Sequence, residues 1–227
     1  MENFRLYKKL ITLPLFVGMS KEELKGIVTQ TKFDFLKAES GHIIVREDEK
    51  SGQLLLLVSG EIELSSHADD KGYVVYEYLK APCTLQPERT FGLTQRYSST
   101  VTAMTMCNLI CINKNEILRL TDVSLIFRLN LLNTISTALQ KQKRPIWASV
   151  PQNPEQRIVR FFLSHCVHPA GHKIFKIKME RLAEELNDSR LHISETLNAM
   201  ATRGLIELSR GKINIPSIER LTGIDIS

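Results

Sequence analysis

One short segment constrains the fold of this chain more than any other, because it combines a corner residue with two runs of helical periodicity. Apolar residues recur at helical spacing on both sides of Asn187, at Leu182, Ala183 and Leu186 and then at Ile193, Leu197 and Met200. Asn187 tolerates the left-handed backbone conformation that a sharp corner needs, and Ser189 is a good N-cap for a second helix. Ala183 is small enough for two helices to cross closely beside it. The segment therefore predicts a helix-turn-helix.

The residues around this motif predict a second, smaller unit. The amphipathic run "EQRIVRFFLSHC" predicts a helix, and "HPAGHKIFKIK" predicts a turn followed by a short strand. After the motif, "GLIELSRGKINI" predicts two short strands around the turn 209–212, in which Gly211 can adopt a positive φ. A β-wing is thus expected to follow the helix pair.

A helix-turn-helix places the N-terminal part of its second helix in the major groove of duplex DNA. There an Arg can bind a guanine edge through two hydrogen bonds, and a Glu can accept one from cytosine. The helix N-terminus and basic side chains can hold backbone phosphates, and a net charge of +5 is compatible with a polyanionic partner. The candidate DNA-binding residues are Lys176, Lys178, Ser189, Arg190, Leu191, His192, Ser194, Glu195, Asn198, Arg203, Arg210 and Lys212.

Two other interpretations of the helix pair stay open. It can be an amphipathic pair without a binding role, or part of a small-molecule-binding module that uses its helices for protein contacts. Glu180, Glu184 and Glu185 make the first helix acidic, which suits a protein partner better than DNA. Those carboxylates can instead complement a helix N-terminus that has no Ser or Thr cap. A salt-dependent affinity for duplex DNA separates these interpretations.

The first half of the chain has strand periodicity instead. Between residues 32 and 113, β-branched, aromatic and Leu-rich runs alternate with Gly residues, which predicts several short strands in a sandwich, roll or barrel. The loop 80–99 is interrupted by two prolines and a glycine, so we expect no regular element in it. Before the strands, the capping-box pattern from Ser20 to Glu23 predicts a helix that runs through Val28.

From about Lys114 the periodicity becomes helical. A heptad-like seam recurs at Leu125, Leu129, Leu132, Ser136 and Leu139. A seam this narrow suits pairing between two helices, including pairing across a dimer axis, but it can equally pack the helix against its own β-domain. We expect this helix to end at Pro145 and to be followed by a hinge, "ASVPQNPEQ", that contains Pro151 and Pro154.

The chain lacks the residues that several other functional classes of protein require. The strands carry only the isolated His42 and His67 where a cupin enzyme needs a cluster of ligands, and no phosphate loop or nucleophile elbow occurs, so we expect no enzyme. The few, scattered cysteines indicate buried thiols in a reduced, cytoplasmic protein, and no apolar run reaches the ~20 residues that span a bilayer. One group resembles a zinc site but falls in an exposed turn, so we expect no metal at His165, Cys166, His168 and His172.

Over nearly its full length, the chain resembles the cyclic-AMP-receptor/FNR (CRP/FNR) family of bacterial transcription regulators. The similar segments are "LPLFVGMSKEEL", the strand pair "LLLLVSGEIEL" with Gly60, the long central helix, and "ERLAEELNDSRLHISETLNAMATRGLIE" with its wing. The resemblance implies an α+β fold with a cyclic-nucleotide-binding-type β-roll (jelly roll) in residues 1–118, a dimerisation helix and hinge in 119–147, and a winged helix-turn-helix in 148–227. It also implies a homodimer, joined at the heptad seam, that binds near-palindromic duplex DNA. RNA polymerase is a further candidate partner.

The chain departs from this family at the phosphate cassette. Nucleotide-binding members carry a Gly-Glu pair and, later, Arg-Ser or Arg-Thr in a strand that ends in Ala. With Ala103 aligned on that Ala, the Arg falls on Tyr97 and the Gly-Glu pair falls on Gln86 and Pro87. Arg96 is one residue away, which in a strand places its side chain on the other face. We therefore predict that cyclic AMP is not the effector, because the charged partners of its phosphate and ribose are missing.

A different effector, or none, is left open. The loop is either a surface turn without a ligand or a pocket for another small anion, lined by Arg89, Arg96, Tyr97, Ser98 and Ser99. An iron–sulfur cluster is not expected, because no Cys precedes Cys83. Haem stays open, since a single His such as His42 or His67 can serve as its axial ligand.

The recognition helix also departs from the family. It has Arg190-Leu191-x-x-x-Glu195 where members commonly have Arg-Glu-x-x-x-Arg. Because Arg and Glu contact different base edges, we expect the preferred DNA sequence to differ from that of the cyclic-AMP receptor.

Overall fold

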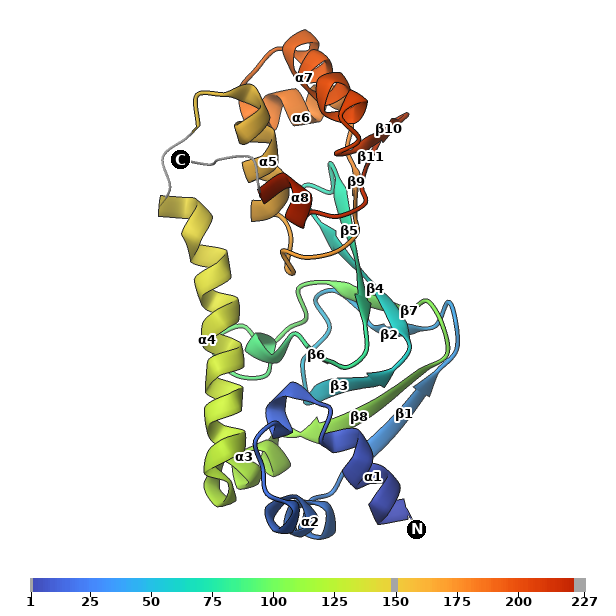
Figure 1. Cartoon of the computed structure of the whole chain (residues 1–227), viewed down its shortest axis with the longest axis vertical. Helices are drawn as coiled ribbons and strands as arrows, with labels where there is room; N and C mark the ends of the chain where they lie inside the picture. The colour runs from blue at the N-terminus through green and yellow to red at the C-terminus, as the bar shows by residue number, and fades with distance from the viewer. Residues whose placement is uncertain (1, 148–150, 223–227) are drawn as a thin grey trace. The chain divides into compact units, whose positions relative to one another are not determined.

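The computed structural model describes residues 2–147 and 151–222 and divides the chain into two compact units (Figure 1). The first unit contains Met1–Ile62 and Leu79–Gln140, and the second contains Glu63–Tyr78 and Lys141–Ser227. The boundaries expected at residues 118 and 147 differ from this division. The segment Glu63–Tyr78 packs with the C-terminal unit, and the division of the central helix falls after Gln140.

Three helical segments open the first unit, namely α1 (Glu2–Leu10), the short 3-10 helix η1 (Pro14–Phe16) and α2 (Lys21–Gln30). The predicted cap of α2 is confirmed, because Ser20 Oγ accepts a hydrogen bond from the backbone N–H of Glu23 at 3.1 Å. The Glu23 carboxylate accepts a hydrogen bond from Ser124 Oγ at 2.6 Å. This contact ties α2 to the residue that precedes the central helix.

The strands of the first unit are antiparallel. One sheet has the order β1-β8-β3-β6, and β2 pairs with β7. The strands are β1 (Asp34–Ala38), β2 (Ile43–Val45), β3 (Gln53–Ser59), β6 (Cys83–Leu85), β7 (Thr100–Ala103) and β8 (Cys107–Asn113). The prediction that loop 80–99 holds no regular element is wrong. It contains β6 and the 3-10 helix η2 (Pro87–Arg89), because Leu85 pairs with Leu55 of β3, a long-range contact that local composition does not show.

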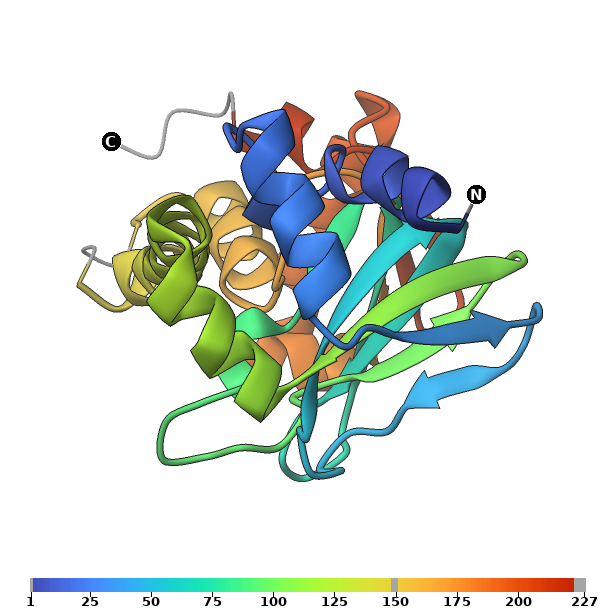
Figure 2. The ribbon, with the colours of Figure 1, turned by 90° about the horizontal axis from the view of Figure 1, so that it is seen from below.

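The core of the first unit lies between its helices and the sheet. Buried side chains of β3 and β8 meet those of α1, α2, α3 (Lys114–Val123) and α4 (Leu125–Trp147). Figure 2 shows α1 and α2, in dark blue, over one side of the cyan and green strands. In the turn that directly follows β3, Gly60 has φ +104°, and a Cβ there would lie 2.6 Å from Cys107 Sγ, so the chain needs glycine at this position.

The central helix α4 packs through one face only. Phe127 and Leu131 are buried against the first unit's core. The heptad seam lies on another face, where the exposed fraction is 62% for Leu125 and 49–54% for Leu129, Leu132 and Leu139. Helix α4 therefore does pack on its own β-domain, as one of the two interpretations expected, but through Phe127 and Leu131 and not through the seam leucines. The expected end at Pro145 is wrong, because α4 continues to Trp147, and the first residues of the expected hinge, 148–150, lie outside the described residues.

The second unit is built on α5 (Pro154–Ser164), β9 (Lys173–Lys176), α6 (Met179–Leu186), α7 (Arg190–Thr202), β10 (Glu207–Ser209), β11 (Lys212–Ile215) and α8 (Glu219–Thr222). Its strand order is β10-β11-β9-β5-β4, where β4 (Glu61–His67) and β5 (Val74–Lys80) form the hairpin from the first half of the chain. Strands β5 and β9 are antiparallel, with Val75 opposite Phe175 and Glu77 opposite Lys173. The mixture of helices and sheets confirms the predicted α+β class.

A buried ion pair joins the hairpin to the second unit. Lys173 Nζ lies 3.2 Å from Glu77 Oε2, and these side chains are 0% and 1% exposed. The Glu77 carboxylate also accepts the backbone N–H groups of Val167 and His168 at 2.7 and 2.9 Å, and Lys173 donates to the Ala170 carbonyl at 2.6 Å. Buried charges are tolerated when they are paired and hydrogen-bonded in this way. The hairpin is therefore an integral part of this unit.

Across residues 2–147 and 151–222, no helix combines the length and the apolar character that a membrane span requires.

Candidate nucleic-acid interface and sensor pocket

The predicted helix-turn-helix is confirmed at its corner. Helix α6 ends at Leu186, and its C-cap Asn187 has the left-handed φ/ψ values 49° and 52° and donates its backbone N–H to the carbonyls of Ala183 and Glu184. The next N–H, that of Asp188, donates to Ala183 O at 3.0 Å. These bonds satisfy the last carbonyls of α6, so the chain can turn sharply without losing hydrogen bonds.

Helix α7 begins at this corner with its own cap. Ser189 Oγ accepts the backbone N–H of His192 at 3.1 Å, as the sequence predicts. Ile193, Leu197 and Met200 are fully buried in the core of the second unit. The other face of α7 is consequently left to solvent, and the exposed predicted residues on or before it are Ser189, Arg190, Leu191, His192, Glu195 and Asn198, with Ser194 half-buried.

Asp188, which the sequence interpretation missed, holds the corner in place. Its carboxylate accepts hydrogen bonds from Arg157 Nη2 at 2.5 Å, His192 Nδ1 at 3.0 Å and the Ser189 N–H at 2.7 Å. The hydrogen bond from His192, assisted by the Ser189 N–H and the Arg157 charge, lowers the pKa of Asp188. An acidic residue beside an N-cap was the only local signal, because Arg157 lies 31 residues earlier in the chain.

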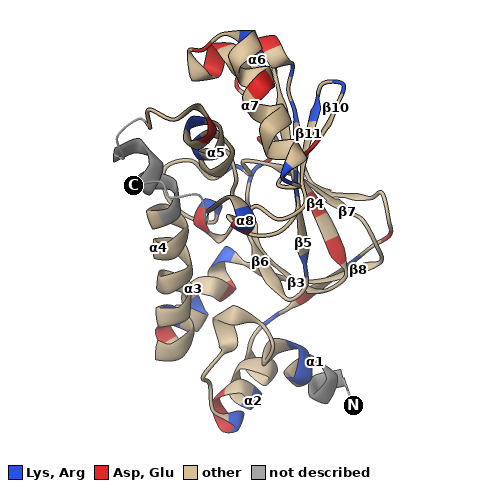
Figure 3. Ribbon diagram, turned by 45° about the horizontal axis from the view of Figure 1, so that its top comes forward, with Lys and Arg blue, Asp and Glu red and all other residues tan. Residues whose placement is uncertain are grey.

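The basic candidates differ in what they contact. Lys178 is exposed at the N-cap of α6, Arg210 lies in the β10–β11 turn, where Gly211 has φ +68° as predicted, and Lys212 begins β11. Figure 3 shows this basic turn beside the acidic positions of α6. Arg203 instead forms an ion pair with Glu155 of α5 and so helps to hold the C-terminal end of α7.

Lys176 contacts an aromatic ring, and the acidic residues of α6 form further ion pairs. Lys176 Nζ lies 4.4 Å from the centre of the Tyr76 ring. Glu180 lies in the first turn of α6, whose N-cap makes no side-chain hydrogen bond. Its position fits the interpretation that acidic side chains complement the N-terminus of this helix. That interpretation is wrong for Glu184 and Glu185, because they lie outside the first turn of α6 and pair with Arg181 at 3.8 and 2.6 Å.

Arg190 is not free in this structure. Its Nε lies 3.2 Å from Glu180 Oε1, and both side chains are largely exposed. Exposed ion pairs of this kind contribute ~0–1 kcal/mol, so DNA can displace this one at little cost. Glu180 therefore positions Arg190 beside α6 in the free protein.

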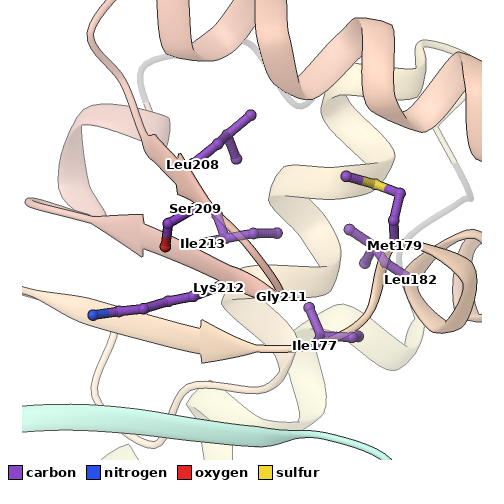
Figure 4. Close-up of a pocket in the computed structure, with 8 residues that line it drawn as sticks. All are labelled: Ile177, Met179, Leu182, Leu208, Ser209, Gly211, Lys212 and Ile213. Atoms are coloured by element: carbon purple, nitrogen blue, oxygen red, sulfur yellow. The ribbon is translucent and has the colours of Figure 1, made fainter.

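A small, mainly apolar pocket of about 70 Å³ lies between α6 and the wing (Figure 4). Met179 and Leu182 reach it from α6, and Leu208 and Ile213 reach it from β10 and β11. The Lys212 side chain extends away from these apolar groups in Figure 4. The pocket marks the packing that joins the wing to α6.

At the phosphate-cassette position of the first unit, Gln86 is 4% exposed and adopts a left-handed conformation with φ 42°. Its Oε1 accepts the Ser98 N–H at 2.7 Å and the Ser98 hydroxyl at 3.0 Å, and its Nε2 donates to Ser99 O at 3.2 Å. The Gln86 side-chain amide thus satisfies both donors of Ser98 and the carbonyl oxygen of Ser99. We call Gln86, Ser98 and Ser99 the sensor corner.

The other predicted pocket residues point elsewhere. Arg96 is exposed and donates to Asp48 O at 2.5 Å, whereas Tyr97 is buried and its hydroxyl donates to Gln53 O at 3.3 Å. Burial raises the pKa of Tyr97. Arg89 Nε lies 3.8 Å from the carboxylate of Glu88, whose pKa is also raised by burial. The structure therefore gathers Ser98 and Ser99 around Gln86, while Arg96 and Tyr97 contact the loop that precedes β3.

The remaining His and Cys candidates have separate surroundings. His42 and His67 are exposed, His165 Nε2 lies 2.9 Å from the Tyr73 hydroxyl, and His172 stacks on Tyr78 with ring centres 4.8 Å apart. The cysteines are free thiols, and burial raises the pKa of Cys83 to about 12. In the part of the chain that the structure describes, no three His, Cys, Asp or Glu side chains form a group that could hold a metal ion.

Two family models match the chain, one on each part. The cyclic nucleotide-binding domain matches residues 35–124, and the Crp-like helix-turn-helix domain matches residues 156–224. The order of these two domains on one chain decides its family. The chain belongs to the CRP/FNR family of transcription regulators. The regulator therefore binds DNA, and the interpretation of its helices as a protein-contact module without DNA is not needed.

Solved structures share the regulator's fold. The catabolite activator protein of Thermus thermophilus is 18% identical, with a TM-score of 0.50 over 93% of this chain and 97% of that one. The sensor domain of the transcriptional regulator DNR from Pseudomonas aeruginosa is 21% identical, with a TM-score of 0.52 over 62% of this chain and 93% of that one. No curated protein matches the regulator by sequence.

Proposed function

We propose that the regulator binds near-palindromic duplex DNA as a homodimer and inserts the N-terminal half of α7 into the major groove. The observation that carries this proposal is the exposed outer face of α7, which directly follows a corner held by Asn187, Asp188 and Ser189. Because its own hydrogen bonds keep this corner in place, the outer side chains can be presented in a fixed geometry. The residues proposed to contact bases are Arg190, Leu191, His192, Ser194, Glu195 and Asn198.

The proposed phosphate contacts surround this helix. Ser189 and the N-terminus of α7 can hold a phosphate, and Lys178 and the wing residues Arg210 and Lys212 supply positive charge. Arg203 can join them only if its ion pair with Glu155 opens. RNA polymerase as a partner and the absence of catalytic activity are proposed on the family resemblance.

The proposed dimer interface is the seam on α4. Its leucines are 49–62% exposed, although Phe127 and Leu131 on the same helix are buried. A heptad stripe left open by its own unit suits the equivalent stripe of a second copy, with each leucine between side chains of the partner helix. Two-fold symmetry then requires two half-sites about one helical turn, ~34 Å, apart.

We further propose that cyclic AMP is not the effector of the regulator. The support is the sensor corner, where the Gln86 amide oxygen already accepts both donors of Ser98. An incoming phosphate would have to displace this amide, and Arg96 is turned toward Asp48 instead. The regulator is therefore proposed to respond to another effector or to none.

The test is selection of random duplex DNA by the full-length protein, followed by sequencing, at two salt concentrations with and without cyclic AMP. We expect enrichment of a near-palindrome without nucleotide and an affinity that falls steeply with salt. Enrichment only with cyclic AMP would overturn the effector proposal, and a site without symmetry would overturn the dimer proposal.

Arg190→Ala sharpens this test. We expect it to reduce discrimination at one base position by ~1–3 kcal/mol while the salt dependence stays unchanged, because the side chain is proposed to contact a base rather than a phosphate. Equal loss of affinity on all sequences would contradict this role. Lys178→Ala is the matched control, for which uniform loss and a shallower salt dependence are expected.

A further inference from the structure

The outermost row of α7 is set by the three side chains that it buries. Successive helical residues are rotated by ~100°, so the row opposite Ile193, Leu197 and Met200 contains Leu191, Glu195 and Asn198. Arg190 lies to one side of this row, where it meets Glu180 of α6. Leu191 therefore holds the most N-terminal position in the row that points directly away from the protein.

Leu191 is an unusual residue for such a position. It is 69% exposed and lies between the exposed Arg190 and His192. The second unit's core is formed by other residues of α7, so the fold does not require an apolar side chain here. A leucine can make no hydrogen bond to a base edge and can only contribute apolar contact.

We propose that Leu191 recognises the 5-methyl group of a thymine in each half-site. This inference rests on the proposed function, because it requires α7 to lie in the major groove. The thymine methyl is the apolar feature that a base pair presents there, and cytosine has only hydrogen at the same carbon. Leu191 thus favours thymine, whereas the neighbouring Glu195 carboxylate accepts from a cytosine amino group and repels the acceptor edge of guanine.

The experiment uses the enriched duplex with single thymines replaced by deoxyuridine, which lacks only the 5-methyl group. At one thymine position of each half-site, we expect the wild-type protein to lose affinity about four-fold per half-site, the ratio that corresponds to ~0.8 kcal/mol for one buried methyl-sized group. Leu191→Ala should bind the thymine duplex more weakly and should show no difference between thymine and deoxyuridine at that position.

Two variants serve as controls. Leu191→Met keeps a long apolar side chain and should keep the preference for thymine. Arg210→Ala in the wing should weaken binding to both duplexes equally, so that its thymine-to-deoxyuridine ratio stays that of the wild type.

The inference is overturned if deoxyuridine is tolerated at every position, or if Leu191→Ala keeps the full preference for thymine. Both results leave DNA binding intact and so leave the proposed function standing. Failure to enrich any duplex would instead overturn the proposed function, and this inference with it.

Discussion

The sensor corner and the corner that precedes α7 use the same backbone device and differ in what fills them. Each turns on a non-glycine residue in the left-handed conformation, Gln86 with φ 42° and Asn187 with φ 49°. The Gln86 side chain is buried, and its amide oxygen accepts both donors of Ser98. Asn187 is exposed, and Ser189, two residues later, caps helix α7. The groups of both corners are hydrogen-bonded, but the first is closed by a buried side chain, whereas the second is followed by the exposed outer face of α7.

The ion pairs show the same contrast. Glu77 and Lys173 are fully buried and share their hydrogen bonds with the backbone, while Arg190 and Glu180 meet in solvent. The first pair has lost its hydration and the second has kept it. One pair therefore serves the fold of the second unit, and the other can exchange its partner for DNA.

The largest expected effect follows from breaking the buried pair. Glu77→Gln leaves the Lys173 ammonium buried beside a neutral amide, so we expect the free energy of unfolding of the second unit to fall by about 3–5 kcal/mol. Urea unfolding followed by circular dichroism measures it. Glu180→Gln is the matched control on the exposed pair and should cost less than ~1 kcal/mol.

If the Glu77→Gln variant does not fold, a double variant that replaces both members of the buried pair still tests this prediction. Glu77→Leu combined with Lys173→Met leaves no unpaired charge and should recover most of the lost stability. Equal effects of Glu77→Gln and Glu180→Gln would contradict the contrast between the two pairs.

The next effect tests whether the sensor corner is closed. Gln86→Ala leaves the N–H and the hydroxyl of Ser98 without their acceptor, so we expect a loss of about 1–3 kcal/mol in unfolding free energy. Gln86→Glu keeps an acceptor oxygen for Ser98 but loses the donor to Ser99 O and buries an unpaired carboxylate, so it should lose at least as much. Unchanged stability in Gln86→Ala would show that Gln86 does not close this corner.

Two helix caps compare the units directly. Ser20 and Ser189 each accept an N–H at 3.1 Å, so each change to Ala should cost ~1 kcal/mol of stability. Only Ser189→Ala should also weaken DNA binding, by about five-fold, because its hydroxyl and the α7 N-terminus are proposed to hold a phosphate. Parallel titrations of DNA test this, and equal DNA affinities would remove Ser189 from the interface.

The smallest effect concerns pH. The folded-state pKa of Asp188 lies below the unfolded value of ~3.9, so its stabilising contribution is fully present above pH ~4 and is lost as pH falls through the folded pKa. Asp188→Asn lacks this contribution at every pH. Its unfolding free energy should therefore fall less steeply than that of the wild type between about pH 4 and pH 2. Parallel curves in acid titrations would contradict the assignment.

Features that depend on neighbours in the sequence were predictable. The caps at Ser20 and Ser189, the corner at Asn187 and the turn at Gly211 all involve groups a few residues apart, and each is confirmed. The heptad spacing of the α4 leucines could be recognised in the sequence. The same spacing, however, is expected whether the helix packs on its own β-domain or pairs with a second copy. Only the burial of Phe127 and Leu131 decided which face α4 turns to its own unit.

The sequence by itself determined the helix-turn-helix, the strand-rich first half and the residue types on the outer face of α7. The tertiary structure decided which polar groups are satisfied by distant partners, namely Asp188 by Arg157, Glu77 by Lys173, and Ser98 by Gln86. It also assigned the segment 63–78 to the second unit through the pairing of β5 with β9. Periodicity and caps are set within one or two turns of the chain, whereas desolvated ion pairs and strand pairing depend on which distant segments the fold brings together.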